Sequence, residues 1–287
     1  MSVRLLAPAK INLTLEVLAK RDDGFHEVRM LMAGVDLYDE MSFTESATLS
    51  LTCDRADLSV GEDNLVLRAA RALQAASGCR LGAKIHLKKH IPVGGGLAGG
   101  STDAAATLKG LDRLWETALG AKRLAEIAAS LGSDIPFCLK SGWALASGRG
   151  EKLKALTLGR SLHLVLANPG FEVSTQWVYK NLGKIQARAI DHSAEAFKAI
   201  ASRNLKALKI AVVNDLELVT ASKYEQISAM KEQFMACGAQ IVQMSGSGPT
   251  VWALFGDERA AKKAQKIMKV AFTHAYYVKT ITKIPIP

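Results

Sequence analysis

The stretch IPVGGGLAGGSTDAAATL, residues 91–108, decides the fold of this chain more than any other. Five glycines occupy the seven positions 94–100, and an alanine-rich segment with helical character follows at once. Glycine inside a helix or strand costs about 1 kcal/mol relative to alanine, because its unfolded backbone is unusually free. A cluster this dense therefore indicates a turn where the backbone passes very close to another group.

Two nucleotide motifs fit this glycine cluster only in part. The spacing Gly94-x-Gly96-x-x-Gly99 matches a dinucleotide-binding turn, but no second strand ending in an acid follows about 20 residues later. The spacing Gly94-x-x-x-x-Gly99 also begins a P-loop, but Gly100 stands where that loop requires its phosphate-binding lysine.

The general case behind both motifs is a phosphate cradle. A glycine-rich turn can point its N–H groups at an anion, and a helix starting at Ser101 adds further N–H groups and the positive end of its dipole. The alternative is a plain tight turn capped by Ser101, which would need only one or two glycines. The density of glycine favours the cradle.

The composition indicates a globular protein, and the spacing of its cysteines indicates free thiols. The chain has 287 residues, of which 49% are hydrophobic and 22% charged, enough for one large or two ordinary domains. Pro8 and Lys10 interrupt the only apolar stretch near the N-terminus, so we expect no signal peptide and no membrane span. The four cysteines are scattered and the histidines lack metal-binding spacing, which favours a cytoplasmic protein without a transition-metal site.

The net charge of +10 favours anionic partners such as phosphates, nucleotides or nucleic acid. The densest basic run, residues 262–269, has helical spacing and contains no aromatic side chain. That pattern is more typical of a solvated helix than of a nucleic-acid patch, so we expect no nucleic-acid partner.

The order of predicted elements indicates an α+β fold with two lobes. Short β-rich runs fill the first third of the chain, and helices predominate from 176 to 237. We place the lobes at 1–155 and 156–287. The predicted strands are 3–8, 11–18, 28–35, 48–53, 83–87, 143–147, 162–167, 241–244, 251–255 and 275–280, and the predicted helices outside 176–237 are 64–77, 101–115, 121–131 and 258–270.

Three segments together resemble the kinase family named for galactose, homoserine, mevalonate and phosphomevalonate. PAKINL (8–13), PVGGGLAGGSTDAA (92–105) and MSGSGPT (244–250) correspond to its three motifs in the same order. DGFH (23–26) and SDIPF (133–137) make the chain similar to the branch of that family that acts on cytidine-diphosphate-linked methylerythritol.

The resemblance implies a reaction and a catalytic pair. ATP, with Mg²⁺, would phosphorylate the 2-hydroxyl of that cytidine compound in the non-mevalonate route to isoprenoids. Asp134 would accept the hydroxyl proton, and Lys10 would keep Asp134 ionised and neutralise charge on the transferring group. The residues alone favour a helix cap at Asp134 and a strand-surface charge at Lys10; the resemblance reverses that preference.

The resemblance also implies which residues bind ATP. Asn64 would lie near the adenine, although it suits a helix start as well, and the metal ligands stay open between Ser101 and Thr102. The implied ATP-binding residues are Asn64, Pro92, Val93, Gly94, Gly95, Gly96, Leu97, Ala98, Gly99, Gly100, Ser101 and Thr102.

A cytosine-binding pocket is the last implied site. Phe25 and Tyr179 would stack on the two faces of the ring, His26 would read its polar edge, and Asn12 and Thr175 would line the same pocket. Core packing in an amphipathic helix explains Tyr179 equally well.

Ala98 departs from the family pattern, which usually has glycine there. If that position requires positive φ, alanine costs about 1 kcal/mol. Thr102 replaces a serine and Phe25 a tyrosine, and neither change removes a catalytic group.

The family implies a ribosomal-protein-like N-terminal lobe with a left-handed βαβ crossover, a ferredoxin-like C-terminal lobe, and an active site in the cleft between them. We expect a monomer or weak homodimer. The rivals are another kinase of the family, acting on homoserine or mevalonate, and a nucleic-acid-binding protein.

Overall fold

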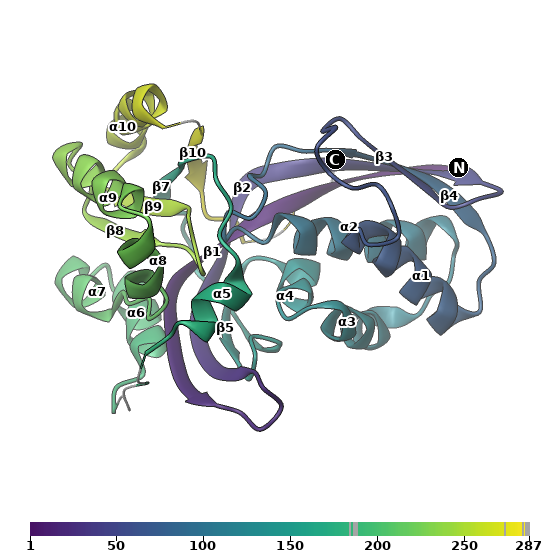
Figure 1. The fold of residues 1–287 in the computed structure, drawn as a ribbon, viewed down its shortest axis with the longest axis horizontal. Helices are drawn as coiled ribbons and strands as arrows, with labels where there is room; N and C mark the ends of the chain where they lie inside the picture. Colours follow the sequence, from purple (N-terminus) through teal and green to yellow (C-terminus); the bar gives the residue numbers. More distant parts are fainter. Residues whose placement is uncertain (184, 186–188, 273, 283, 285–287) are drawn as a thin grey trace.

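The computed structural model describes residues 1–183, 185, 189–272, 274–282 and 284. It has a mixed α+β fold with two domains, which lie side by side in Figure 1. The first domain holds a six-stranded sheet of order β3-β4-β2-β5-β6, with β1 paired to β2, and four helices lie against it. Its elements are β1 (Ser2–Lys20), β2 (His26–Ser46), β3 (Ser50–Cys53), α1 (Leu65–Ser77), β4 (Gly82–Lys88), α2 (Gly99–Leu114), α3 (Gly120–Leu131), α4 (Ile135–Lys140), β5 (Trp143–Ser147) and β6 (Lys152–Leu156).

Strands β1 and β2 form one long antiparallel hairpin that extends toward the second domain (Figure 1). The sequence predicted two separate strands, 3–8 and 11–18, but the structure has one continuous strand with a bulge in place of the break. An extra residue in one strand bends the ribbon and increases its twist without ending the pairing. Register shifts occur between Pro8 and Lys10, between Asn12 and Thr14, and between Val17 and Ala19.

A β-α-β unit leads directly into the glycine cluster. Strands β3 and β4 pair in parallel, and α1 connects them. Asn64 caps α1 by accepting a hydrogen bond from the Val66 N–H, and Gly78 ends the helix in the left-handed conformation. These ends confirm the prediction of a helix from 64 to 77 that stops at glycine.

The second domain is a four-stranded sheet of order β10-β7-β9-β8, in which every neighbouring pair is antiparallel. Helices α5 to α9 lie between β7 and β8 in the chain, and α10 lies between β9 and β10. The elements are β7 (His163–Asn168), α5 (Thr175–Lys180), α6 (His192–Ala201), α7 (Leu205–Ala211), α8 (Glu217–Lys223), α9 (Gln226–Ala236), β8 (Ile241–Met244), β9 (Val251–Phe255), α10 (Glu258–Ala271) and β10 (His274–Lys279).

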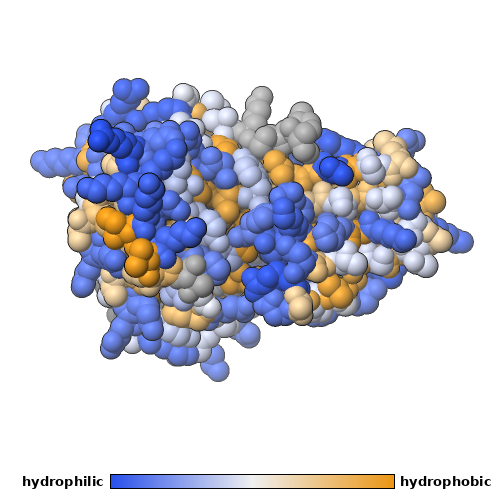
Figure 2. Space-filling model, turned by 90° about the horizontal axis from the view of Figure 1, so that it is seen from above, coloured by the Kyte–Doolittle hydropathy of each residue, from blue (hydrophilic) through white to orange (hydrophobic). Residues whose placement is uncertain are grey.

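Among the described residues, no helix is long and apolar enough to cross a membrane. The face drawn in Figure 2 is mainly hydrophilic, and its hydrophobic patches are separated by hydrophilic side chains. The basic run 262–269 lies on α10, as the helical spacing predicted, with Lys262 paired to Glu258 at 2.6 Å.

Candidate functional site

A cavity of about 1280 Å³ brings together the glycine cluster, the second half of β1, the turn between β1 and β2, and α5. Both domains contribute to its wall. Four Lys and Arg side chains line it: Lys10, Lys20, Arg149 and Lys180. Their positive charge suits anionic ligands.

The glycine cluster forms the phosphate-sized part of this wall. Gly94, Gly96 and Ala98 all have left-handed backbone, with φ of 61°, 73° and 58°. Within the described part of the chain, the N–H groups from Gly94 to Ala98 donate no hydrogen bond to the protein. These free donors and the start of α2 form a site that can accept an anion.

The α2 helix begins at Gly99, two residues earlier than predicted, and no side chain caps it. Ala98 stands at the cap position with φ 58° and ψ 33°. The alternative of a tight turn capped by Ser101 is therefore wrong, because Ser101 lies inside the first helical turn. The expectation that position 98 needs positive φ is confirmed.

A loop of the second domain, within residues 244–250, packs against Gly96. A Cβ atom at Gly96 would lie only 2.2 Å from the Ser245 carbonyl oxygen. The Ser245 hydroxyl donates to the Gly96 carbonyl at 2.9 Å, and the Thr250 N–H donates to the Gly95 carbonyl at 3.3 Å. The segment 244–250 thus supports the glycine cluster from behind, a role that sequence reasoning did not assign to Ser245.

Lys10 and Asp134 meet inside the cavity. The Lys10 ammonium lies 3.5 Å from the Asp134 carboxylate, and it donates to the Asn12 side chain at 2.7 Å and to the Gly96 carbonyl at 3.3 Å. Lys10 is only 4% exposed, whereas the Asp134 side chain is 33% exposed. Each contact of Lys10 involves a different segment, so this amine links the Asp134 carboxylate to the glycine cluster.

Asp134 precedes α4 but makes no side-chain capping bond. Asp134 therefore holds the cap position of α4 without capping the helix through its side chain. The interpretation of Lys10 as a strand-surface charge is wrong, because Lys10 is buried. The carboxylate is directed to Lys10 and to the cavity instead, where it can accept a proton.

The two hydroxyls considered for metal binding lie on different sides of α2. Ser101 lines the main cavity, whereas Thr102 is buried and lines a separate cavity of about 100 Å³ with Cys138. In the described ranges, no group of three or more His, Cys, Asp or Glu side chains could hold a metal ion. Mg²⁺ takes oxygen ligands and commonly shares them with substrate phosphates, so Ser101 fits it and Thr102 does not.

Most of the remaining residues of the phosphate loop line the cavity, and three of them do not. Gly94, Gly95, Gly96, Ala98, Gly99 and Gly100 line the cavity; Pro92, Val93 and Leu97 do not. The side chain of Leu97 is buried, and its carbonyl accepts from the Lys10 N–H at 3.1 Å. Asn64 also lies outside the lining because its side chain is used as the α1 cap, and its neighbour Leu65 lines the cavity instead.

At the opposite end of the cavity, the aromatic side chains pair differently from the implied sandwich. His26 stacks on Tyr179, with ring centroids 5.0 Å apart and planes inclined by 24°. Arg149 lies over the Phe25 ring at 4.7 Å, and Phe25 is 50% exposed. Sequence reasoning did not find Arg149, whose place beside Phe25 comes from the β5–β6 turn.

Burial of His26, with a smaller effect from Lys20, lowers the pKa of its imidazole. The ring is therefore mostly neutral near pH 7 and can both donate and accept. Thr175 lies at the start of α5, with its hydroxyl 2.8 Å from that of Ser247. Asn12 completes this wall, donating to the Met30 sulfur at 3.1 Å.

Ion pairs hold the turn that carries Phe25 and His26. Arg21 bonds Glu27 at 2.7 Å and Asp23 at 3.0 Å, and Asp23 accepts from the Phe25 N–H at 3.1 Å. The hydrogen bond from Arg21 holds the pKa of the Asp23 carboxyl below its usual range. These groups are partly exposed, so each pair contributes little alone, but together they restrict the turn.

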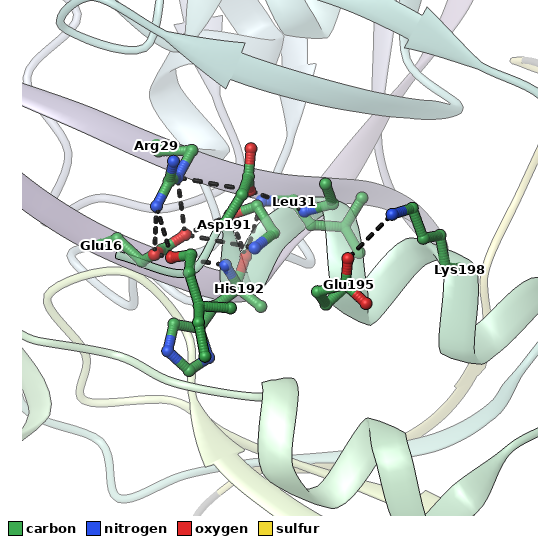
Figure 3. A network of polar contacts seen from close by, with 11 residues as sticks. Glu16, Arg29, Leu31, Asp191, His192, Glu195 and Lys198 are labelled. Atoms are coloured by element: carbon green, nitrogen blue, oxygen red, sulfur yellow. Dashed lines mark hydrogen bonds and ion pairs between the residues drawn. The ribbon is translucent and has the colours of Figure 1, made fainter. Parts of the chain in front are cut away.

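A buried network fixes the base of the same hairpin to the second domain. Figure 3 shows Glu16 between Arg29 and the start of α6. Glu16 is fully buried; it bonds Arg29 at 2.8 and 3.0 Å and accepts from the Ser193 hydroxyl at 2.9 Å. Although burial opposes ionisation of Glu16, the donors from Arg29 and Ser193 outweigh it and lower the pKa of Glu16. The charged pair thereby anchors the hairpin that carries the aromatic end.

Comparison with known proteins agrees with the motifs. Residues 64–142 match the family model described as GHMP kinases N terminal domain, and residues 196–273 match GHMP kinases C terminal. A 4-diphosphocytidyl-2-C-methyl-D-erythritol kinase of Caldanaerobacter subterraneus is 41% identical over 99% of this chain and 98% of its own length. The enzyme of the same name from Pelotomaculum thermopropionicum is 45% identical over 92% of each chain.

Comparison with solved structures identifies the same family of kinases. The crystal structure of a 4-(cytidine 5'-diphospho)-2C-methyl-D-erythritol kinase superposes with a TM-score of 0.82 at 31% identity, covering 97% of this chain and 99% of that one. Homoserine kinase from Cytophaga hutchinsonii, at 20% identity and a TM-score of 0.78, shares the fold. The chain therefore belongs to the GHMP kinase family and, within it, to the 4-diphosphocytidyl-2-C-methyl-D-erythritol kinases.

Proposed function

We propose that this kinase transfers the γ-phosphate of ATP to the 2-hydroxyl of 4-diphosphocytidyl-2-C-methyl-D-erythritol, in the non-mevalonate route to isoprenoid precursors. One observation carries the proposal: a single cavity holds unpaired glycine-loop donors, the Lys10–Asp134 pair and an aromatic group of side chains. Relatives named for this substrate support the choice of acceptor.

In the proposed reaction, Asp134 accepts the proton of the attacking hydroxyl. A bond forms between that oxygen and the γ-phosphorus, the bond from the γ-phosphorus to the bridging oxygen breaks, and ADP leaves with the electron pair. Lys10 balances negative charge on the transferring group and keeps Asp134 ionised. The contact of 3.5 Å between the two charged groups supports both roles.

We assign the triphosphate to the N–H groups of the glycine loop and the start of α2. Mg²⁺, held by the ATP phosphates with Ser101 as a protein ligand, would neutralise charge on the β- and γ-phosphates. The adenine would lie near Leu65, which lines the cavity beside Gly100.

For the cytosine ring, we propose stacking between Phe25 and Tyr179, with His26 on its polar edge and Asn12 and Thr175 beside the methylerythritol. This arrangement requires that His26 leave its stack on Tyr179 and that Phe25 leave Arg149. Stacking and edge recognition of a base supply comparable contacts in return.

The types and bounds of the two lobes, the location in the cell, the partners and the oligomeric state are also proposals. The antiparallel order β10-β7-β9-β8 supports a ferredoxin-like second lobe, and the parallel β3-α1-β4 unit is the candidate for the left-handed crossover of a ribosomal-protein-like first lobe. We propose lobes at 1–155 and 156–287, a cytoplasmic location, small-molecule partners without nucleic acid, and a monomer or weak homodimer.

The test is ADP release from purified protein with ATP and Mg²⁺ against a panel of acceptors. The panel holds diphosphocytidyl-methylerythritol, homoserine, mevalonate and galactose. The proposal predicts turnover with the cytidine compound alone, and CDP should inhibit it competitively. Turnover with another acceptor, or no effect of CDP, would contradict the assigned substrate and the cytosine pocket.

A further inference from the structure

Three buried charged side chains lie directly behind the glycine loop. They are Asp39 on β2, Lys89 after β4, and Asp103 in α2, and none of the three side chains is more than 3% exposed. The Lys89 ammonium contacts the Asp39 carboxylate and lies 2.8 Å from Asp103. Buried charges are costly unless they are paired, so this cluster needs an explanation.

The contacts of this charged cluster fix the chain at both ends of the loop. Before the loop, Asp39 accepts from the N–H groups of His90 and Ile91 at 2.6 and 2.9 Å, which pins the segment to the sheet just ahead of Pro92. After the loop, the bond from Lys89 to Asp103 ties α2 to the same point. Residues 92–98 lie between these two anchors.

Lys89 also passes close to the first residue of the helix. A Cβ atom at Gly99 would lie 3.2 Å from the Lys89 ammonium. The lysine therefore occupies the space directly beneath the first turn of α2, which is the turn whose N–H groups face the cavity.

A proton on Asp103 would balance the charge of the cluster. Lys89 with two ionised carboxylates would bury a net negative charge, which the protein interior disfavours. Burial raises the pKa of Asp103 well above its usual range. The Asp39 carboxylate accepts from the Lys89 ammonium and from the N–H groups of His90 and Ile91. A neutral Asp103 beside an ion pair of Lys89 and Asp39 satisfies both conditions.

We propose that Asp39, Lys89 and Asp103 are positioning residues for ATP. They hold the glycine loop and the first turn of α2 so that their N–H groups already point at the triphosphate before it arrives. Pre-arranged donors bind an anion without the cost of ordering the loop at that moment. This inference rests on the proposed function, since it requires ATP at the glycine loop.

The first test replaces Lys89→Met and compares it with Lys88→Met. Lys88 is the matched control, because it pairs with Glu40 across the same two strands at 3.0 Å but is half exposed. We expect Lys89→Met to raise KM for ATP about 10- to 100-fold, as for other misplaced binding groups, with KM for the cytidine substrate changed less than about twofold. Lys88→Met should leave both values unchanged.

A second test uses a substitution that preserves shape, Asp39→Asn, in case Lys89→Met does not fold. Asp39→Asn puts an amide N–H against donors and should weaken ATP binding about tenfold, measured by calorimetry with a non-hydrolysable analogue.

The inference is overturned if Lys89→Met or Asp39→Asn melts at a lower temperature while its affinity for ATP equals that of the wild type. A merely structural role would give that result. If wild type and Lys88→Met themselves fail to bind ATP, the proposed function fails first, and the two failures are thereby distinguished.

Discussion

The two ends of the cavity are constructed from different parts of the chain. The phosphate end consists of backbone: left-handed residues at 94, 96 and 98, supported by Ser245 and enclosed by the Asp39–Lys89–Asp103 cluster. The aromatic end consists of side chains, and Phe25 there is half exposed. In the function we propose, the first end is arranged for its ligand in advance, whereas the second exchanges its own stacking contacts for those of a base.

Removing the proposed base should have the largest effect on turnover. Asp134→Asn keeps the shape of the side chain but cannot accept the hydroxyl proton, so we expect kcat to fall about 100- to 10,000-fold. KM for ATP should change little. Steady-state kinetics measure both values, and near-normal kcat would exclude Asp134 as the base.

Adding a methyl group at Gly96 should have the second-largest effect, a loss of ATP affinity at the phosphate end. Gly96→Ala places Cβ against the Ser245 carbonyl and forces alanine to φ of about 73°, so we expect about a 100-fold loss of ATP affinity. Gly78→Ala is the control, because Gly78 has a similar φ of 70° with nothing within 4 Å of the added methyl. Equal behaviour of the two variants in ATP titrations would show that close approach at Gly96 does not matter.

Losing a stacking surface should affect only the aromatic end. For Tyr179→Ala we expect about a tenfold rise in KM for the cytidine substrate, because each stacked base gains about 1–3 kcal/mol. KM for ATP should stay constant. Tyr277→Ala removes a tyrosine stacked on His163 outside this cavity and should alter neither constant. A Tyr179→Ala enzyme with normal substrate KM would place the base elsewhere.

Lowering the pH should weaken binding of the cytidine substrate at the aromatic end, but by less than the Tyr179→Ala substitution does. Burial and Lys20 keep the pKa of His26 below its usual value, so the ring is neutral at pH 7 and gains a charge only as the pH falls below about 6.5. That charge meets Lys20, so KM for the cytidine substrate should rise a few-fold between pH 7 and 5.5. The pH dependence should disappear in His26→Gln; its persistence there would assign it to another group.

The smallest expected change is at Ala98. Replacing Ala98→Gly relieves the left-handed strain at φ 58°, but it also frees the unfolded chain, so stability should rise by no more than about 1 kcal/mol. Urea unfolding measures this difference. A loss of stability would mean that the methyl group of Ala98 contributes packing that outweighs its strain.

The helix ends and turns that the sequence predicts correctly are those that depend on a few adjacent residues. Asn64 and Gly78 delimit α1, Gly132 follows α3, and the glycine cluster identifies its own turn, because caps and turns depend on a few adjacent residues. Strand β6, with the sequence KLKAL, and the six-residue α4 were missed because each is short and lacks a clear apolar period.

The site was harder to predict than the fold. The pairing of Lys10 with Asp134 followed only from the family resemblance, since nothing local links two residues so far apart. The buried cluster of Asp39, Lys89 and Asp103 was not found, because composition treats charged residues as surface. The pairing of His26 with Tyr179 depends on side-chain rotation, which no motif encodes.

The most direct test of this account is whether one molecule binds two nucleotides at once. CDP would be titrated by calorimetry into protein already saturated with a non-hydrolysable ATP analogue and Mg²⁺. The account predicts that CDP still binds with a stoichiometry of one, at the aromatic end, with nearly unchanged affinity. If the ATP analogue instead prevents CDP binding, the cavity holds a single nucleotide site, and the division into a phosphate end and a cytosine end is wrong.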